Sequence, residues 1–495
     1  MKTDIDQLQR LDQVRLRLMH PHQVPVPLFA RPEVPLEMKA VTELLQVLQV
    51  VDTLTRLRQQ APDFLDAQAC LERVAVTPDF HKGSGIPIGT VLATRGFIVP
   101  QAIGNDINCG MRLHTTHLTQ AQVVERLDEL EHKLRYLFFE GGRNIPMTRN
   151  QRQALCQEGL LGLLGAVPPA QDEGLWSLFH RLDLERSLER VHGLGSMPAR
   201  PLQGLENYLG SANGLSRDDQ IGSIGGGNHF VEIQVIDKIL DGTTAHAWGL
   251  RQGQVVIMVH TGSLMIGSLC GTIYRQMVKD LFPPGLKHPE NGIFLLPEGL
   301  PQTEVFWDWL NSATNFAFAN RMFLALIALR GLHEVCGEGE SELLYDAPHN
   351  LVWREGEVYV HRKGACPARG PEGFSGYGEP VLVPGSMGAS SFILAGQGNP
   401  EALCSASHGA GRQLSRGQAQ GYDDQQFSEF LKNFRVVTPS DFRRLRPDVL
   451  REKLADLKQE APFAYKGIGP VIATLAQAGI ARPVAELLPL LTVKG

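Results

Sequence analysis

The sequence lacks a strong excess of charge, an apolar leader and a regular cysteine framework. Its 47 basic and 53 acidic residues leave a net charge of −6. This balance excludes a global electropositive field, so any nucleic-acid site must be a local patch. The first thirty residues lack an apolar core, and no uncharged apolar run is long enough to span a bilayer, so we expect neither a signal peptide nor membrane binding. The seven cysteines are odd in number and scattered, which favours reduced thiols in a cytoplasmic protein.

Two common nucleotide-binding signatures are also missing. The chain contains neither the Gly-Lys-Ser/Thr ending of a Walker loop nor a Rossmann Gly-x-Gly-x-x-Gly. The common nucleotide-binding folds are therefore unsupported, although other modes of nucleotide binding are not excluded.

From residue 222 onward, short apolar runs alternate with polar or glycine-rich clusters. This pattern predicts buried strands, each followed by a loop that carries His, Asn, Ser or Gly. Loops on a rigid sheet are where chemistry usually sits, so we expect a functional site at these strand ends. The expected strands lie at 230–236, 255–259, 358–360 and 381–383, with a strand and loop at 343–350 and the start of a helix at 405–412.

Leucine and valine at helical spacing predict helices between and after these strands. The first predicted helix covers 40–59, and the second begins after an N-cap at Thr119. Two more cover 304–329 and 440–459, and Gly479 ends the last one. We find no linker, so we predict an α+β fold with one large catalytic domain over 39–495, in which helices surround mixed sheets. A proline-rich N-terminal arm over 1–38 would pack on this body, and 141–222 carries no chemical signature.

Candidate metal ligands lie in several of these loops. Asp106 and Cys109 are three residues apart within a glycine-bracketed stretch, and His229, His260 and His349 each sit at a strand end. Spacing alone also fits a turn with a buried thiol and hydrogen-bonded structural histidines. Carboxylate, thiolate and imidazole together suit a first-row transition metal, and affinity order alone favours zinc.

His408 stands in a different setting, followed by Gly409 and Gly411. If the chain is helical from 409, Arg412 and Arg416 share a face near the positive end of the helix dipole. That setting suits phosphate and makes His408 a candidate nucleophile or acid/base. Alternatively, the glycines only begin a helix, and His408 is a surface histidine with no chemical role.

Several motifs together resemble those of the RtcB family, the GTP- and manganese-dependent RNA ligases of tRNA splicing and RNA repair. The resemblance runs from about Pro78 to the last residue, and 141–222 and the arm match poorly. The motifs are Asp-Ile-Asn-Cys-Gly (106–110), Gly-Asn-His-Phe-x-Glu (227–232), His-x-Gly-Ser (260–263), Asp-x-x-His-Asn (346–350), His-Arg-Lys-Gly-Ala (361–365), Pro-Gly-Ser-Met-Gly (384–388), His-Gly-Ala-Gly-Arg (408–412) and Val-Lys-Gly (493–495).

The resemblance implies a set of roles. His408 would take GMP from GTP and pass it to an RNA 3′-phosphate, after which a 5′-hydroxyl would displace GMP and seal the strand. A 2′,3′-cyclic phosphate would first be hydrolysed. The family also implies an archease-type activator as a potential partner. The implied ligands of two Mn²⁺ ions are Asp106, Cys109 (bridging), His229, His260 and His349, and the implied GTP-binding residues are Asn228, Glu232, Asn350, Ser386, Gly409, Ala410, Gly411 and Lys494.

One position departs from the family pattern. The family usually continues His-Ser-Gly-Ser with Arg, whereas this chain has Leu264, which cannot contact a phosphate. The basic stretch before Gly-Asn-His is also thin, because Arg217 is followed by Asp218 and Asp219. These differences leave open an RNA 3′-end guanylyltransferase or cyclic phosphodiesterase without efficient sealing. A non-enzymatic RNA-end-binding protein fits the retained ligand set and His408 poorly.

Overall fold

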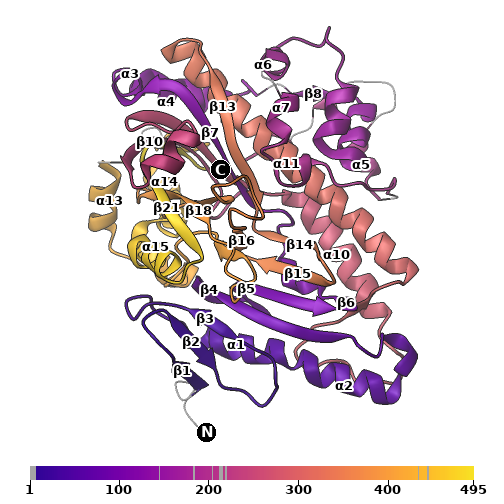
Figure 1. Ribbon diagram of the computed structural model, residues 1–495. Helices are drawn as coiled ribbons and strands as arrows, with labels where there is room; N and C mark the ends of the chain where they lie inside the picture. The colour runs from indigo at the N-terminus through magenta and orange to yellow at the C-terminus, as the bar shows by residue number, and fades with distance from the viewer. Residues whose placement is uncertain are drawn as a thin grey trace.

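Two large β-sheets and a long buried helix organise the molecule (Figure 1). The computed structural model describes residues 7–143, 145–181, 184–202, 204–210, 216–217, 220–432, 434–442 and 445–495. Helices surround antiparallel and mixed sheets, so the predicted α+β class is confirmed. All seven cysteines lie in the described ranges and are free.

The larger sheet has eight strands among the described residues, and its central strands carry the motif loops. Neighbours along the path β13-β7-β11-β10-β21-β18-β17 are antiparallel, and β20 pairs in parallel with β21. Strand β11 is buried at every residue, as its unbroken apolar run predicts. The strands are β7 (Gly110–Thr119), β10 (Phe230–Ile239), β11 (Gln254–Thr261), β13 (Ser341–Pro348), β17 (Pro380–Val383), β18 (Ser391–Gly396), β20 (Val436–Val437) and β21 (Ala481–Val493).

The second sheet has the order β1-β2-β3-β4-β5-β15-β14 and lies in the lower half of Figure 1. The N-terminal segment adds three strands to it, because Leu28 of β3 pairs in parallel with Val76 of β4. Whether residue 38 is a domain boundary stays a prediction. The strands are β1 (Leu8–Arg10), β2 (Arg15–Leu18), β3 (Pro27–Phe29), β4 (Cys70–Ser84), β5 (Ile86–Arg95), β14 (Asn350–Glu355) and β15 (Val358–Lys363).

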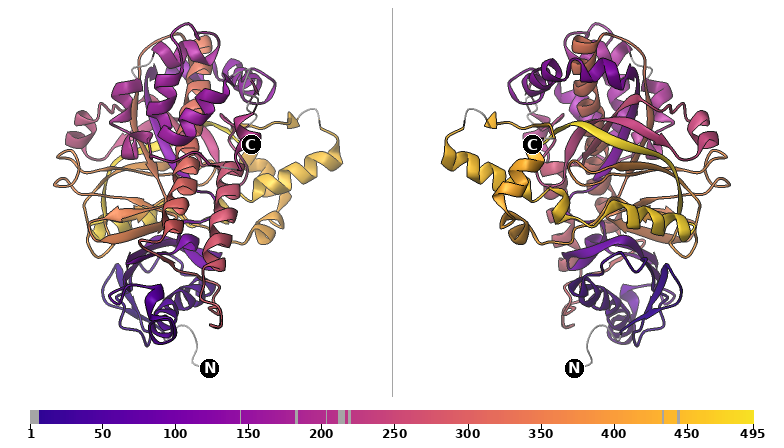
Figure 2. Two further views of the ribbon diagram at one scale, coloured as in Figure 1. Left: turned by 90° about the vertical axis from the view of Figure 1, so that its right-hand side faces the viewer. Right: turned by 90° about the vertical axis from the view of Figure 1, so that its left-hand side faces the viewer.

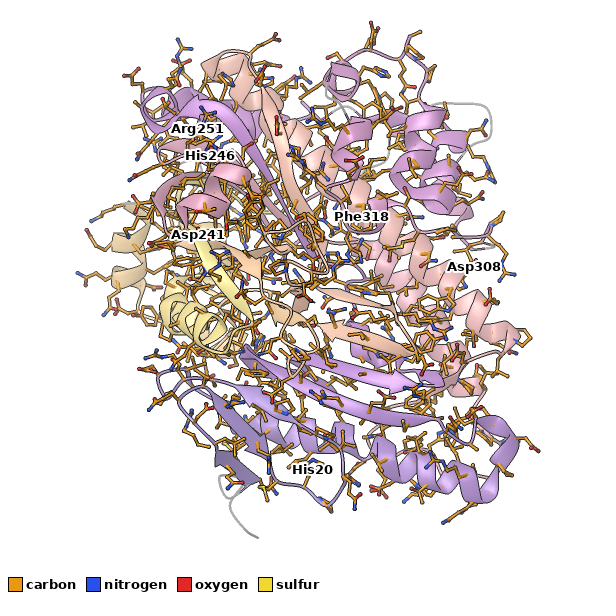
Figure 3. The ribbon with its side chains drawn as sticks, in the orientation of Figure 1. His20, Asp241, His246, Arg251, Asp308 and Phe318 are labelled. Carbon is orange, nitrogen blue, oxygen red and sulfur yellow. The ribbon has the colours of Figure 1, made fainter. Side chains whose placement is uncertain are left out.

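Helix α11 (Pro301–Cys336) is the longest element, at 36 residues, and extends beyond the predicted 304–329. It is long and apolar enough to cross a membrane, but its most apolar 18-residue window is 100% buried, which identifies a core helix. Figure 3 labels Phe318 in the interior and Asp308 near the outer end of this helix. The helices α10 (Leu264–Asp280), α4 (Leu127–Phe139), α5 (Arg149–Ala166) and α6 (Leu175–Arg181) pack against it.

The remaining elements are short or lie at the periphery. Figure 2 shows the segment with α13 and α14 extending to one side of the body. The helices are α1 (Met38–Leu48), α2 (Val50–Gln60), α3 (Gln120–Val124), α7 (Leu184–Leu188), α8 (Glu206–Leu209), α9 (Gly242–Ala247), α12 (Arg416–Gln420), α13 (Asp424–Lys432), α14 (Pro447–Lys458) and α15 (Ile468–Gln477). The strands are β6 (Phe97–Ile98), β8 (Pro146–Met147), β9 (Ser216–Arg217), β12 (Leu296–Pro297), β16 (Ala365–Pro367) and β19 (Ser405–Ser407).

Several predicted boundaries were wrong. The expected helix at 40–59 is two helices, α1 and α2, which meet at Gln49. Thr119 is the N-cap, as predicted, and its N–H donates to Gln122 Oε1 at 2.9 Å, but the helical region that follows divides into α3 and α4. The helix expected from 440 begins at Pro447, and the chain ends in the thirteen-residue strand β21 rather than in a helix alone.

Candidate active site

Three predicted metal ligands converge at the ends of adjacent strands. Cys109 lies directly before β7, His229 directly before β10, and His260 near the end of β11, and these strands are neighbours in the sheet. The Sγ atom of Cys109 lies 3.3 Å from Nε2 of His229 and 3.4 Å from Nε2 of His260. Their ligand atoms all lie within 4.8 Å of one another, which is close enough for one cation to bind all three.

Asp106 and His349 complete this cluster. Oδ2 of Asp106 lies 3.0 Å from Nε2 of His229, and Nε2 of His349 lies 3.3 Å from Nε2 of His260. The backbone N–H of His349 donates to the carbonyl of Cys109 at 2.8 Å, which fixes the two loops together. The structure therefore brings all five predicted ligands to one place.

Backbone carbonyls hold the outer nitrogens of two imidazoles, so that their inner nitrogens face the other ligands of the cluster. Nδ1 of His229 faces the carbonyl of Ile224 at 3.1 Å, and Nδ1 of His260 faces the carbonyl of Asn228 at 3.2 Å. A carbonyl can only accept, so Nδ1 donates in each ring, and Nε2 is the nitrogen that would present its lone pair to a bound cation. This donor set fits a first-row transition metal.

Burial controls protonation in the cluster. Burial, and then the Asp106 carboxylate, raise the pKa of the Cys109 thiol well above its usual range. Burial also lowers the pKa of His260 and of His349 well below the usual range of an imidazole. In the metal-free protein these two imidazoles are neutral and the thiol is protonated, so a bound cation would displace the thiol proton.

His408 lies beside the cluster and directly follows β19. Its ring centroid is 4.7 Å from that of His349. Its Nδ1 lies 2.6 Å from Oδ2 of Asp79, a completely buried carboxylate that also accepts from Thr77 Oγ1 at 2.6 Å. Burial alone would raise the pKa of Asp79, but the interactions with His408, Thr77 and His81 together outweigh burial and lower that pKa. His408 is therefore anchored through Nδ1.

A cleft beside His408 contains nearly all the residues predicted to bind GTP. It also contains Arg412 and Arg416, which the sequence linked to a phosphate setting, and Phe230 and Tyr465, which sequence reasoning did not place there. Asn350 is the exception: its side chain donates to the carbonyl of Asp106 at 3.2 Å and accepts from the N–H of Gly364 at 2.8 Å. The predicted residues in the cleft are Asn228, Glu232, Ser386, Gly409, Ala410, Gly411 and Lys494.

Comparison with known proteins agrees with this geometry. The family model described as "tRNA-splicing ligase RtcB" matches residues 60–495. The "tRNA-splicing ligase RtcB" of Thermococcus kodakarensis is 32% identical, with 99% of each chain covered. The "RNA-splicing ligase RtcB" of Mycobacterium tuberculosis is 34% identical over 84% of this chain and 96% of that protein.

The chain belongs to the RtcB family. The resemblance seen in the motifs is thereby confirmed, and it extends further toward the N-terminus than Pro78. The "tRNA-splicing ligase RtcB" of Nanoarchaeum equitans, 29% identical, also aligns with 97% of this chain and 100% of that protein.

Two polar residues of the cleft, Glu232 and Lys494, are buried. Glu232 accepts from Gln234 Nε2 at 2.6 Å and from the Thr492 hydroxyl, and burial raises its pKa to about 7. Nζ of Lys494 donates to the carbonyl of Gly227 at 2.6 Å, and burial lowers its pKa. The last strand, β21, thus brings the C-terminal motif of this RtcB-family chain into the cleft.

The prediction of a helix from residue 409 was wrong. Residues 405–407 form β19, and α12 begins only at Arg416. Gly411 adopts a φ of +78°, and a Cβ there would lie 2.2 Å from the carbonyl oxygen of Asp79, so packing against β4 bends the loop. Arg412 is not on a helix, and its Nη1 instead donates to the Tyr465 hydroxyl at 3.1 Å. The helix-dipole argument therefore does not apply here.

Leu264 lies at the edge of the metal cluster as the first residue of α10. Its backbone N–H donates to Oδ1 of Asp106 at 3.1 Å, and its side chain is half-buried. The departure from the family pattern is thus located beside a predicted metal ligand. Asp218, Asp219 and the side chain of Arg217 lie outside the described residues.

Proposed function

We propose that this chain joins RNA 3′-phosphate or 2′,3′-cyclic phosphate ends to 5′-hydroxyl ends, using GTP. The position of His408 carries the proposal: its imidazole is anchored to Asp79 on one side and lies against the His349 ring on the other. A nucleophile so placed can receive a nucleotide while its phosphate lies near the metal ligands. The membership of the chain in the RtcB family supports the same chemistry.

Two Mn²⁺ ions would be held by Asp106, Cys109, His229, His260 and His349. When bound, the ions would neutralise phosphate charge and orient an in-line displacement. The same donor set also suits zinc. Binding of manganese in place of zinc would therefore depend on the coordination geometry and on which metal is available.

The hydrogen bond to Asp79 defines which nitrogen of His408 reacts. A carboxylate accepts, so Nδ1 bears the proton and Nε2 carries the lone pair. Nε2 attacks the α-phosphorus of GTP, a P–N bond forms, and pyrophosphate leaves. Asp79 keeps the proton on Nδ1 and stabilises the positive charge that develops on the ring.

The guanine would lie near Glu232 and Lys494. Guanine presents N1–H and N2–H donors beside the O6 acceptor, so a carboxylate and an ammonium match it. Asn228, Ser386 and the segment 409–411 line the same cleft and would contact the rest of the guanylate. Asn350 would support the metal loop, since it bonds the Asp106 carbonyl.

Sealing follows by two further transfers. An oxygen of the RNA 3′-phosphate attacks the phosphorus on His408, the P–N bond breaks, and an RNA-(3′)pp(5′)G end forms. The 5′-hydroxyl oxygen then attacks the RNA 3′-phosphorus, loses its proton, and GMP leaves. A 2′,3′-cyclic phosphate is first hydrolysed to the 3′-phosphate.

The test uses GTP labelled at the α-phosphate, Mn²⁺ and RNAs with defined ends. The expected results are a labelled protein, a labelled RNA intermediate and then a sealed strand from 3′-phosphate and 5′-hydroxyl ends. A protein that never becomes labelled, or that seals 5′-phosphate ends instead, would contradict the proposal.

Leu264 favours a second candidate function. Without an arginine beside the metals, the chain would activate or hydrolyse RNA 3′ ends as a guanylyltransferase or cyclic phosphodiesterase and seal them poorly. The same assay separates these functions: a guanylyltransferase would accumulate the labelled RNA intermediate without a sealed product. A cyclic phosphodiesterase would open the cyclic phosphate and give neither. An archease-type activator, should this chain need one, would increase turnover in that assay. A cytoplasmic location stays a prediction.

A further inference from the structure

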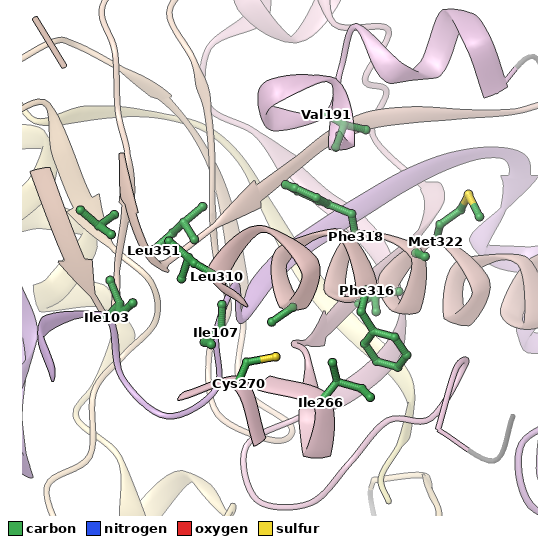
Figure 4. Packing of buried hydrophobic residues seen from close by; sticks show 14 of the residues in the cluster. Ile103, Ile107, Val191, Ile266, Cys270, Leu310, Phe316, Phe318, Met322 and Leu351 are labelled. Atoms are coloured by element: carbon green, nitrogen blue, oxygen red, sulfur yellow. The ribbon is translucent and has the colours of Figure 1, made fainter. Parts of the chain in front are cut away.

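Among the polar side chains that helix α11 buries, Asn320 and Arg321 are two whose burial in an apolar core costs free energy and needs an explanation. Asn320 and Arg321 are both 0% exposed, whereas most of their neighbours on the helix are apolar. Burying an amide or a guanidinium is costly unless every polar atom finds a partner. Figure 4 shows Phe316 and Phe318 of this helix among other buried apolar residues, including Ile107.

Arg321 contacts three segments that carry predicted metal ligands. Its Nη1 donates to the carbonyl of Asn108 at 2.5 Å and to that of Thr261 at 3.1 Å. Its Nε donates to Oδ1 of Asp346 at 2.8 Å. Asn108 precedes Cys109, Thr261 follows His260, and Asp346 is three residues before His349. One guanidinium thus joins the ends of β7, β11 and β13.

Asn320 contacts the fourth segment. Its Nδ2 donates to the carbonyls of Ser223 at 3.0 Å and Gly262 at 3.2 Å, and its Oδ1 accepts from the N–H of Ser223 at 3.1 Å. The next residue, Ile224, supplies the carbonyl that faces Nδ1 of His229. Asn320 therefore ties the loop before His229 to the loop after His260.

The surroundings leave Arg321 little freedom to move. Its guanidinium lies 5.0 Å from the centre of the Phe318 ring. A Cβ at position 110 would lie 3.0 Å from Cζ of Arg321, so the glycine after Cys109 leaves room for the guanidinium. Arg112 binds the other oxygen of Asp346 at 3.0 Å and fixes that carboxylate in turn.

We propose that Asn320 and Arg321 are positioning residues that fix the four ligand-bearing segments relative to one another and thereby set the metal affinity of the site. This inference rests on the proposed metal-binding function. Both residues would act through the backbone of the ligand loops, and Arg321 also through Asp346. Outer residues that orient metal ligands commonly contribute roughly 10- to 100-fold to metal affinity.

Two variants and two matched controls test the proposal. Arg321→Lys keeps the charge but loses the fork, and its control Arg152→Lys changes an equally buried arginine that bonds the carbonyls of Met147 and Leu209 instead. Asn320→Ala is matched by Asn315→Ala, a buried asparagine of the same helix that bonds Cys156 and Met197. Thermal melting shows which variants fold, and Mn²⁺ titration of the metal-free proteins by calorimetry gives the affinity.

We expect Arg321→Lys and Asn320→Ala to bind Mn²⁺ roughly 10- to 100-fold more weakly, while the controls stay within about threefold of the unchanged protein. Activity should recover at high Mn²⁺, because the half-saturating metal concentration rises and kcat is retained. Equal affinity in variants and controls would overturn the inference, as would failure of both test variants to fold. If the unchanged protein binds no metal at all, the proposed function itself fails.

Discussion

Asp79 and His408 are separated by 329 residues in sequence, yet Oδ2 of the one lies 2.6 Å from Nδ1 of the other. The carboxylate is completely buried on β4, and the imidazole follows β19. This contact fixes both the orientation of the ring and the position of its proton. It leaves Nε2 as the atom that can accept a nucleotide.

Replacing Asp79 by Asn should slow guanylylation of His408 by up to about 10⁴-fold, because the amide can donate to Nδ1 and favour the wrong tautomer. Metal content should not change, since the Asp79 carboxylate bonds His408 and Thr77 rather than the predicted metal ligands. Mass spectrometry of the protein after incubation with GTP measures the rate. Thr77→Val is the control: it removes a neighbouring hydroxyl but keeps the Asp79–His408 contact, and it should have a much smaller effect.

His408→Ala should abolish covalent GMP while metal content and melting temperature stay unchanged. His408 is expected to bond the nucleotide and not the ions. In the unchanged protein the adduct should be acid-labile and alkali-stable, as a phosphoramidate is. A labelled protein band in the Ala variant would show that another residue is guanylylated.

Strand ends were the part of the site that the sequence predicted well. Each of His229, His260 and His349 borders an apolar run, and the pairing of β10, β11, β7 and β13 brings these runs side by side. A strand pattern shows where a run ends but not which runs are neighbours, so convergence became visible only in the structure. Before the structure, only the motif resemblance implied that these histidines belong to one site.

Asp79 and the course of the chain after His408 could not be predicted for a related reason. Nothing local links Asp79 to a histidine 329 residues away. The helix expected at 409 fails because Gly411 packs onto the Asp79 carbonyl, a contact between β4 and a distant loop. Strand β21 was missed because it pairs with β10 and β18, and those partners lie far away in sequence.

Acid should destabilise the metal-free protein through three histidines outside the cluster, of which two are buried and His192 is half-buried. Burial lowers the pKa of His81, His192 and His361 to about 4 from an ordinary value of 6.5. The unfolded chain therefore binds these protons first, and the stability they contribute is complete above pH 6.5 and is lost as the pH falls toward 4. These three histidines alone should lower the free energy of unfolding by up to about 4 kcal/mol per pH unit between these values.

Urea denaturation at about pH 7, 6 and 5 measures this loss. His361→Gln should reduce the slope by about one proton, because His361 accepts from the N–H of Val99 only while neutral. A free energy of unfolding that stays constant from about pH 6.5 to 5 would contradict the assignment of these rings as neutral.

Cys109→Ser should abolish binding of the second metal ion, because a neutral hydroxyl is a poor bridge where a thiolate stood. In the unchanged protein, affinity should rise about tenfold per pH unit near neutrality, since metal binding displaces the thiol proton. The Ser variant should lose that dependence. Elemental analysis and calorimetry at two pH values measure both effects, and an unchanged stoichiometry in the variant would place the site elsewhere.

Leu264→Arg should raise sealing of generic RNA ends without changing guanylylation of His408. The residue lies beside Asp106, and an arginine there would add a charge-assisted contact to an RNA phosphate, worth about 1.5–3 kcal/mol, or roughly 10- to 100-fold. GTP would be held by other residues, so only the RNA-dependent step should change. Met265→Arg is the matched control, because Met265 is the next residue but is 64% exposed, and its replacement adds the same charge.

The two half-reactions are measured separately, with labelled GTP for guanylylation and with defined RNA ends for sealing. Sealing should increase in Leu264→Arg and change little in Met265→Arg. If the unchanged protein already seals as well as the Leu264→Arg variant, another basic residue such as Arg217 makes the phosphate contact. If guanylylation and sealing are both weak in the unchanged protein and Leu264→Arg changes neither, the defect lies before RNA binding, and the reaction scheme inferred from the family does not apply to this chain.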